Sequence, residues 1–308
     1  AIESGRTGEA SQDYSKSSLH SLEWITNYSN SFGDHNLKVM AGYSYQYNKY
    51  SGLNASNKDF PNDALEDNNL GSGTFAKDEG EVDMGSYMND NKLIAFFGRV
   101  SYDWKGRYMM TASLRHEGSS KFGKNYKWGN FPAVSFGWRI SDEPFMQETK
   151  SWLTDLKLRA DYGVTGNQNF DSYKSLNTMS GFGYYIYNGK YYQVWGPGKN
   201  VNPNLRWEKG KNWNIGLDWT LFGGKLFGSF NYYNRKQQDL LGDYKVSIPP
   251  YLFDQTFVNV GTMRNSGFEF DITWNAVKTK DFSYSLNVIG ATMSNKFVSF
   301  SNNNFEGQ

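Results

Sequence analysis

The stretch from Leu37 to Tyr50, LKVMAGYSYQYNKY, decides the fold. Alternate positions starting at Leu37 pass from aliphatic residues to tyrosine, while most of the positions between them are small or polar. A period of two is that of a β-strand, whose successive side chains point to opposite faces. The stretch therefore predicts a strand with two unlike faces, one of which grades from aliphatic to aromatic along its length.

The composition favours sheet and excludes several classes of function. Aromatic residues make up 18% of the chain, with 32 Gly and only 7 Pro, a mixture typical of strands. The absence of Cys excludes disulfides, thiolate catalysis and Cys-based zinc sites. Lys plus Arg number 32 against 31 Asp plus Glu, so we expect no nucleic-acid partner. No apolar run is long enough for a membrane helix, but a membrane strand needs only alternate apolar residues.

The spacing of the alternating segments points to a barrel in a membrane. Short connections alternate with long ones, and the connection from Ser141 has room for one helical turn. Loops this long are uncommon in soluble domains, whereas outer-membrane barrels have short turns on one side and long loops on the other. The predicted strands lie at 18–30, 36–50, 92–104, 107–117, 131–140, 155–165, 211–221, 225–236, 266–276 and 282–294, with long loops at 51–91, 118–130, 166–210 and 237–265.

Aromatic residues gather at both ends of the predicted apolar faces, with aliphatic residues between them. Two such girdles are expected where ring edges meet lipid headgroups. The predicted membrane girdle consists of Trp104, Tyr108, Trp138, Trp219 and Trp274 beside the short turns and Tyr43, Tyr45 and Tyr47 toward the long loops.

The opposite faces of the same segments are polar, as a barrel lumen requires. We predict an all-β fold, an antiparallel transmembrane β-barrel. Small and charged residues would not fill a closed ten-strand barrel, so we expect the chain to form a contiguous arc of about ten strands from a larger barrel. A soluble β-sandwich is the alternative, although it needs no aromatic residues at both ends of its apolar face. The lumen-facing polar residues are predicted to be Arg99, Arg115, Glu117, Arg159, Asp161 and Glu269.

The first residues, AIESGRTGEASQDYSK, do not form a secretory signal, because they have neither a basic start nor an apolar middle. We therefore expect either a trimmed precursor or a piece of a longer chain. All of residues 1–308 are assigned to one β-barrel domain.

Five blocks of sequence stand out over about residues 92–275. They are RHEGSSKFGKNYKWGNFPAVSFGWRISDEPFM from Arg115, LKLRADYGVTGNQNF from Leu156, NPNLRWEKGKNWNIGLDW from Asn202, FNYYNRKQQDLL from Phe230 and NVGTMRNSGFEFDITW from Asn259. In their order and spacing these blocks resemble the SusC/RagA-like TonB-dependent transporters of the outer membrane. The resemblance implies that the larger barrel has about 22 strands.

The resemblance implies TonB-dependent import of a nutrient, a glycan or an oligopeptide, across the outer membrane of a Gram-negative bacterium. It implies a SusD-like surface lipoprotein as partner, and contact with TonB through an N-terminal part that this sequence lacks. The plug, the TonB-contacting segment and the closing strands are also expected to be absent. A siderophore or cobalamin receptor and a non-transport outer-membrane adhesin are the alternatives. No cofactor is implied.

The extracellular loops carry the candidate contact residues for substrate or partner. Asn188-Gly189 is a strong type I′ turn signal and predicts a hairpin within 181–198. Its exposed rings mark either a contact surface or simple loop packing. The loop 118–130 is interpreted first as a brace between loops and second as a stacking surface. The candidate contact residues are Tyr126, Trp128, Tyr184, Tyr185, Tyr187, Tyr191, Tyr192 and Trp195.

Other polar groups carry weaker signals. Arg115 and Glu117 suit contact with a substrate or plug, but a lumen charge balanced by Lys157, Arg159 or Asp161 is the simpler interpretation. No Ser–His–Asp arrangement can be argued, so we expect no enzyme. The acidic residues of 63–90 fit no EF-hand, which favours a solvated loop over a Ca²⁺ site and predicts no metal. These acids are Asp63, Glu66, Asp67, Asp78, Glu79, Glu81 and Asp83.

Overall fold

The computed structural model describes residues 8–64, 66–78 and 83–300. These residues fall into two compact units, one within 1–22 and 46–92 and the other within 23–45 and 93–308. Each unit is described by itself below. None of the described helices has the length and apolar composition needed to span a lipid bilayer.

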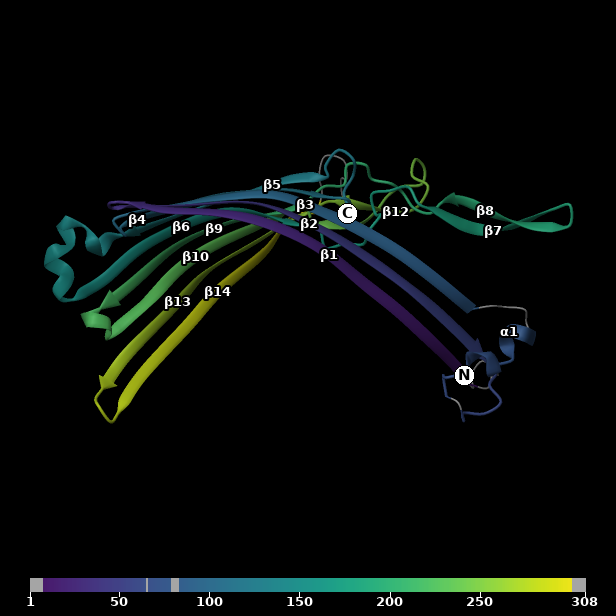
Figure 1. The fold of residues 1–308 in the computed structure, drawn as a ribbon, viewed down its shortest axis with the longest axis horizontal. Coiled ribbons are helices and arrows are strands. Elements are labelled where there is room, and N and C mark those ends of the chain that lie inside the picture. Colours follow the sequence, from purple (N-terminus) through teal and green to yellow (C-terminus); the bar gives the residue numbers. More distant parts are fainter. Residues whose placement is uncertain (1–7, 65, 79–82, 301–308) are drawn as a thin grey trace. The chain divides into compact units, whose positions relative to one another are not determined.

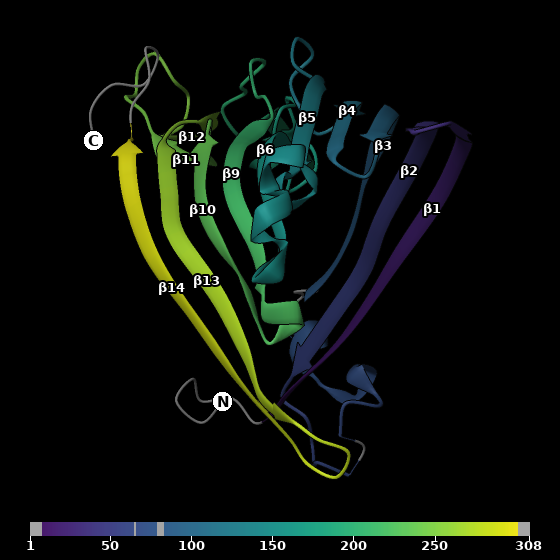
Figure 2. The ribbon, with the colours of Figure 1, turned by 90° about the vertical axis from the view of Figure 1, so that its left-hand side faces the viewer.

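Ten strands form one sheet, and its paired neighbours from β3 to β14 are antiparallel (Figure 1). Figure 2 shows β9, β10, β13 and β14 side by side in the order of the sheet. The predicted ten-strand antiparallel sheet is confirmed. In sheet order the strands are β1 (Glu9–Phe32), β2 (His35–Lys58), β3 (Asp83–Trp104), β4 (Tyr108–Ser119), β5 (Trp128–Arg139), β6 (Leu153–Asn167), β9 (Glu208–Leu221), β10 (Leu226–Gln238), β13 (Thr262–Lys278) and β14 (Ser283–Ser299).

Two of the long loops contain hairpins of their own, which explains why β6 pairs with β9 and β10 with β13. The hairpin of β7 (Met179–Tyr187) and β8 (Lys190–Pro197) is the one that Asn188-Gly189 predicts. Both turn residues have positive φ, 52° and 69°, as a type I′ turn requires. The hairpin of β11 (Leu241–Lys245) and β12 (Gln255–Asn259) has no such turn signal, and the sequence did not predict it.

The remaining elements are short helices. The predicted helical turn after Ser141 is present as two consecutive 3₁₀ helices. In chain order the helices are η2 (Leu70–Ser72), α1 (Phe75–Asp78), η3 (Ile140–Asp142), η4 (Pro144–Ser151) and η5 (Phe222–Gly224).

The first unit contains the largest error in the predicted boundaries. The predicted loop 51–91 is shorter, because β2 continues to Lys58 and β3 already begins at Asp83. Beyond Tyr50 the apolar alternation stops, so periodicity no longer marks the strand although its hydrogen-bonded ladder continues. The Asn57 side chain fixes the connection: its amide nitrogen donates to the carbonyls of Leu70 at 2.8 Å and Gly73 at 2.9 Å.

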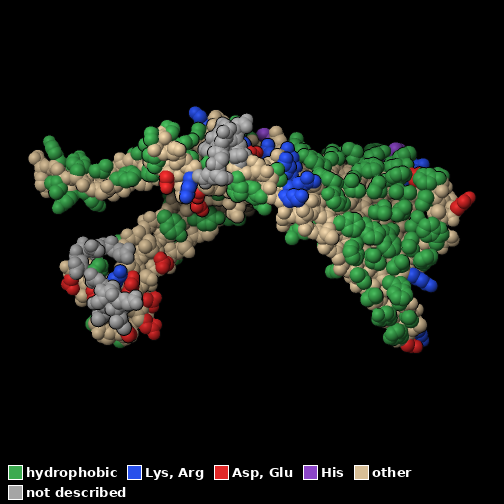
Figure 3. All heavy atoms as spheres, turned by 180° about the vertical axis from the view of Figure 1, so that it is seen from behind, with side chains coloured by type: hydrophobic (Ala, Val, Ile, Leu, Met, Phe, Trp, Pro, Cys, Tyr) green, Lys and Arg blue, Asp and Glu red, His purple; other side chains and the backbone are tan. Residues whose placement is uncertain are grey.

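Strand register sorts the side chains of the second unit onto an apolar and a polar face. Residues opposed across antiparallel strands point to the same side of the sheet. Figure 3 shows hydrophobic side chains gathered into a continuous area over part of the sheet. One apolar row crosses seven strands through Trp104, Tyr108, Trp138, Leu158, Leu217, Phe230 and Phe270.

A charge on the apolar face tests whether that face meets lipid. Ile215 lies on β9 between Trp213 and Leu217 and is 50% exposed. We expect Ile215→Arg to lower the free energy of unfolding of the full-length protein in lipid vesicles by about 2–4 kcal/mol, as a buried arginine near mid-bilayer does. Urea unfolding followed by tryptophan fluorescence measures this change.

Asn214→Arg is the matched control, one residue away on the polar face and opposite Asp161. It places the same charge toward water and a carboxylate, so it should cost little. Equal losses of stability in the two variants would contradict a lipid-facing role for the apolar face.

Candidate functional site: the polar face, the outer loops and the turns

The polar face carries charges that are paired within the sheet. Arg159 on β6 binds Asp218 on β9 through two hydrogen bonds of 2.7 Å, from Nε to Oδ2 and from Nη2 to Oδ1. Its Nη2 also donates to Asn231 Oδ1 on β10 at 3.0 Å. Two parallel bonds fix the guanidinium plane, so one cation links three neighbouring strands.

Arg115 and Glu117 pair with each other, which settles how their charges are balanced. The guanidinium Nη2 lies 2.6 Å from Glu117 Oε1 and 3.4 Å from Ser44 Oγ. The prediction that Lys157, Arg159 or Asp161 balances this pair is wrong, because the register opposes Arg115 to Phe97 and Phe131 instead. Local alternation placed both side chains on one face but could not tell which charge each would meet.

The other predicted polar-face residues lie where alternation placed them. Arg99 is opposed to Ser113, and Asp161 to Ser135 and Asn214. Glu269 is opposed to Asn231 and Ala291. The charges of the polar face therefore have small or polar neighbours across the strands.

The outer loops have a buried aromatic core above the sheet. Phe122 and Leu205 are fully buried, and they pack with Phe131 and Trp207. The Trp207 ring centroid lies 4.6 Å from Phe122 and 5.2 Å from Phe131. Burial of Phe122 agrees with the interpretation of loop 118–130 as a brace.

Side-chain amides join these loops to the β11–β12 hairpin. Asn259 donates to the carbonyls of Arg206 at 2.7 Å and Asp239 at 3.0 Å, and its Oδ1 accepts from the Arg206 amide at 2.9 Å. The Arg206 guanidinium in turn pairs with Asp239 at 2.6 Å. Gly123 packs so closely that a Cβ atom there would lie 2.0 Å from the Pro203 carbonyl oxygen, so only glycine fits.

The β7–β8 hairpin, in contrast, is uncovered on both faces. Figure 1 shows it projecting beyond the end of the sheet. Tyr184 and Tyr191 are 67% and 74% exposed on one face, and Tyr185 and Tyr187 are 53% and 65% exposed on the other. Tyr192 packs on Tyr185 at 5.5 Å between centroids. Tyr187 also contacts Tyr192, at 6.4 Å between centroids, so the hairpin presents exposed aromatic side chains on both faces.

The two remaining candidate contact residues differ in placement. Tyr126 is an exposed residue of the loop after β4. Trp128 is the first residue of β5, and its ring stacks on His116 at 4.7 Å and Phe96 at 6.4 Å. Phe96 and His116 are opposed on the apolar face, so Trp128 continues that face and does not belong to the loop surface.

The predicted girdle residues lie along the apolar face. Trp104, Tyr108 and Trp138 stack in sequence beside the turns, with centroids 5.4 and 6.4 Å apart. Trp219 packs on Phe230, and Trp274 is opposed to Leu226 and Leu286. In the second unit Tyr43 packs on Phe96, and in the first unit Tyr47 packs on His20. Tyr45 lies between them on β2.

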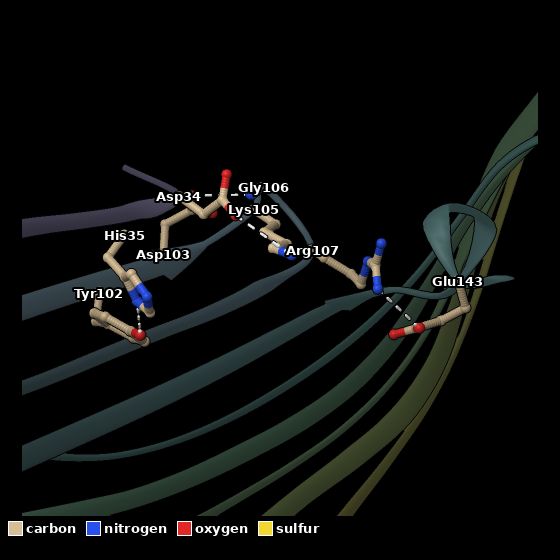
Figure 4. A network of polar contacts seen from close by, with 8 residues as sticks. All are labelled: Asp34, His35, Tyr102, Asp103, Lys105, Gly106, Arg107 and Glu143. Atoms are coloured by element: carbon tan, nitrogen blue, oxygen red, sulfur yellow. Dashed lines mark hydrogen bonds and ion pairs between the residues drawn. The ribbon is translucent and has the colours of Figure 1, made fainter. Parts of the chain in front are cut away.

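A polar network holds the turn ends of the second unit together, as Figure 4 shows. Asp103 Oδ1 accepts from the Gly106 amide at 3.1 Å, and Lys105 pairs with Asp34 at 3.3 Å. At one end of this group of contacts lies Glu143, a buried carboxylate that precedes η4 and pairs with Arg107. The network was not predicted, because Glu143 looks like any acidic loop residue in the sequence.

Glu143 gathers three donors from the ends of two strands. Tyr108 OH donates to Oε1 in a short hydrogen bond, Trp138 Nε1 donates to the same oxygen at 2.9 Å, and Arg107 Nη1 donates to Oε2 at 3.1 Å. The hydrogen bonds from Tyr108 and Trp138, with help from Arg107, lower the pKa of the Glu143 carboxyl. The carboxylate therefore fastens the helical connection to two girdle residues.

The structure describes no candidate metal centre. Within the described ranges, no group of three or more His, Asp and Glu side chains is arranged to hold a metal ion. Of the acidic residues of 63–90, Glu79 and Glu81 lie outside the described residues, as does the side chain of Asp83.

A family model described as TonB dependent receptor-like, beta-barrel matches residues 3–308. The TonB-dependent receptor P3 of Formosa agariphila is 33% identical over 96% of this chain and 29% of its own length. The TonB-dependent receptor SusC of Bacteroides thetaiotaomicron is 37% identical over 65% of this chain and 20% of its own. A solved structure of the RagAB peptide transporter is similar with a TM-score of 0.76 at 25% identity, over 95% of this chain and 31% of that one.

The Glu143 network makes stability depend on pH in a known direction. Because the pKa of Glu143 is lower in the folded state, its contribution is complete above the pKa of the unfolded chain and is lost as pH falls through the folded value. We expect Glu143→Gln to lower the melting temperature of the full-length protein at pH 7, and the deficit to shrink as the pH falls below about 4. Thermal unfolding from pH 3 to 8 measures both.

Glu148→Gln is the matched control, since Glu148 is an exposed carboxylate on η4 of the same connection. It should change the melting temperature little at any pH. A deficit for Glu143→Gln that stays constant down to pH 3 would contradict the assigned role of the carboxylate.

Proposed function

Because the chain belongs to the TonB-dependent receptor-like β-barrel family, we propose that it forms part of the wall of a transporter that imports a nutrient in a TonB-dependent way. Members of this family are outer-membrane proteins whose strands cross the bilayer repeatedly, and the family is one of receptors and transporters rather than enzymes. The chain spans less than a third of the length of these curated relatives, so the activity of the whole relatives is a proposal for this chain.

The observation that carries the proposal is 33% identity to a TonB-dependent receptor over 96% of the chain. A match over 96% of the chain includes loops as well as strands, so it is more than a similarity of barrel folds. Structures of transporters for iron complexes, such as the ferric citrate transporter, share only 12% identity with a TM-score of 0.56, which is a likeness of fold alone. The alternative of a siderophore receptor therefore gains no support from this likeness.

We propose a glycan or an oligopeptide as the nutrient and a SusD-like surface lipoprotein as the partner. The relative SusC and the RagAB peptide transporter support this choice of class. The polar face supports it too, because a paired cation such as Arg159 leaves the wall hydrated without a fixed net charge. A neutral, polar nutrient would then pass along Ser, Asn and Thr side chains without binding tightly to any of them.

Within this proposal, the β7–β8 hairpin contacts the lipoprotein or the nutrient. Its aromatic rings are rigid, uncharged and exposed on both faces of the hairpin. Tyrosine and tryptophan are also enriched at the positions that dominate the binding energy of interfaces. Tyr126 adds one exposed ring from the loop after β4. The braced loops beside the hairpin would hold the rim in place during such contacts.

Deletion of the full-length gene in its own bacterium tests the function. We expect slower growth on one class of polymer, either glycans or oligopeptides, as sole carbon source, and normal growth on the corresponding monomers. Growth should return with the wild-type gene but not in a strain without TonB. Normal growth on all polymers, with a defect only under iron limitation, would contradict nutrient import of this kind and favour a siderophore receptor.

Removal of the hairpin rings tests the contact surface. We expect the six-fold serine variant of the full-length transporter to capture the lipoprotein or the nutrient at least about tenfold more weakly, since one hot-spot ring among the six contributes about 2 kcal/mol or more and about 1.4 kcal/mol is tenfold. Co-purification with the lipoprotein and polymer uptake measure the two contacts separately. The variant is Y184S, Y185S, Y187S, Y191S, Y192S and W195S.

The matched control changes exposed residues of the same hairpin that carry no ring. Met179, Ile186 and Val194 are 55%, 64% and 41% exposed, and serine at these positions keeps the Asn188-Gly189 turn. The control variant should behave as the wild type. Full activity of the ring variant in both assays would show that the hairpin rings serve loop packing only.

A further inference from the structure

Four basic side chains form one row on the apolar face at the long-loop ends of β9, β10, β13 and β14. Lys211 is opposed to Lys236, Lys236 to Arg264, and Arg264 to Lys296. Opposed residues share a face, and alternation from Trp213 and Tyr232 shows that this face is the apolar one. Figure 3 shows Lys and Arg side chains gathered at the border of the hydrophobic area.

The row is electrostatically unfavourable by itself. Neighbouring strands lie about 4.8 Å apart, so each cation faces another of the same sign, and like charges directly opposed destabilise a sheet. Among the described residues, none of the four forms an ion pair with a carboxylate. Arg264 meets only a neutral partner, the amide oxygen of Asn234, at 2.5 and 2.9 Å when that amide is oriented to accept.

The position of the row identifies the surroundings that could supply the missing anion. On the same face, the next position toward the turns carries Trp213 on β9, Asn234 on β10 and Ser266 on β13. The position after that carries Tyr232 and Phe268. The three rings, of Trp213, Tyr232 and Phe268, are 37%, 40% and 42% exposed. These rings belong to the aromatic belt at the membrane interface. The cations therefore lie one or two same-face positions beyond the rings, at the level where the hydrocarbon ends and the headgroups begin, on the side of the long extracellular loops.

We propose that this basic row is a binding site for a phosphate-bearing lipid headgroup of the outer leaflet. Arg and Lys bind phosphate oxygens by charge-assisted hydrogen bonds, and juxtamembrane cations attract anionic lipids. Because barrel strands tilt by about 40°, three steps across the sheet spread the four cations over roughly 9 Å of depth. A headgroup with more than one phosphate matches that spread better than a single free phosphate ion.

Binding of lipid A to the full-length transporter in detergent tests the site. We expect wild-type protein to retain diphosphoryl lipid A, and the variant K211Q, K236Q, R264Q and K296Q to bind it at least about tenfold more weakly, given the attraction of each cation to an anionic surface. Native mass spectrometry with added lipid measures the bound fraction. Monophosphoryl lipid A should bind more weakly than the diphosphoryl form, and inorganic phosphate at millimolar concentration should not displace either.

The matched control removes four cations near the short turns, K150Q, K225Q, K278Q and K280Q, and should bind lipid A as the wild type does. Equal binding by wild type and row variant would overturn the proposal, and so would full displacement by inorganic phosphate, which would indicate a site for soluble anions.

If the four-fold variant does not fold, the single variants R264Q and K236Q replace it and should each weaken binding. The proposal depends on the outer-membrane location and not on the nutrient, so growth assays and lipid binding fail independently.

Discussion

The register of the antiparallel sheet is the constraint on which the rest of the structure depends. Each strand places successive side chains in two different surroundings, so a slip of one residue would turn every Trp, Tyr and Leu of the apolar row toward the polar side. The row from Trp104 to Phe270 and the pairing of Arg159 with Asp218 are two consequences of the same alignment. Because one register sets both faces, a shift of any strand would alter the apolar face and the polar face together.

The sequence predicts the parts of this arrangement that have a local signal. Alternation located all ten long strands. A few adjacent residues were also enough to place the girdle tryptophans, the polar-face charges and the Asn188-Gly189 hairpin. The ends of β2 and β3 were missed because the backbone ladder continues where the apolar period stops. The β11–β12 hairpin was missed because it has no distinctive turn residues. In both places hydrogen bonding with distant segments, rather than local propensity, maintains the strand.

Contacts between residues far apart in the sequence could not be predicted either. Nothing near Glu143 in the sequence shows that Tyr108, Trp138 and Arg107 donate to it, and nothing near Lys211 shows that Lys236, Arg264 and Lys296 share its row. Each of these clusters is assembled by register across strands or by a helical connection. The contact residues of the outer loops were named by composition, and Trp128 shows the weakness of that approach, since its ring extends the apolar face.

The outer loops have two parts, the braced loops around Trp207 and the projecting β7–β8 hairpin, and these differ in how freely their sequences can change. Gly123 leaves no room for a side chain beside Pro203, and Trp207 is locked between two phenylalanines, so sequence drift in the braced loops is narrowly limited. The hairpin of β7 and β8 joins them through a neck where the Gly198 amide donates to the Thr178 carbonyl at 2.8 Å. No residue of the hairpin belongs to the buried cluster of Phe122, Phe131, Leu205 and Trp207, so changes of sequence beyond that neck leave the packing of the braced loops intact.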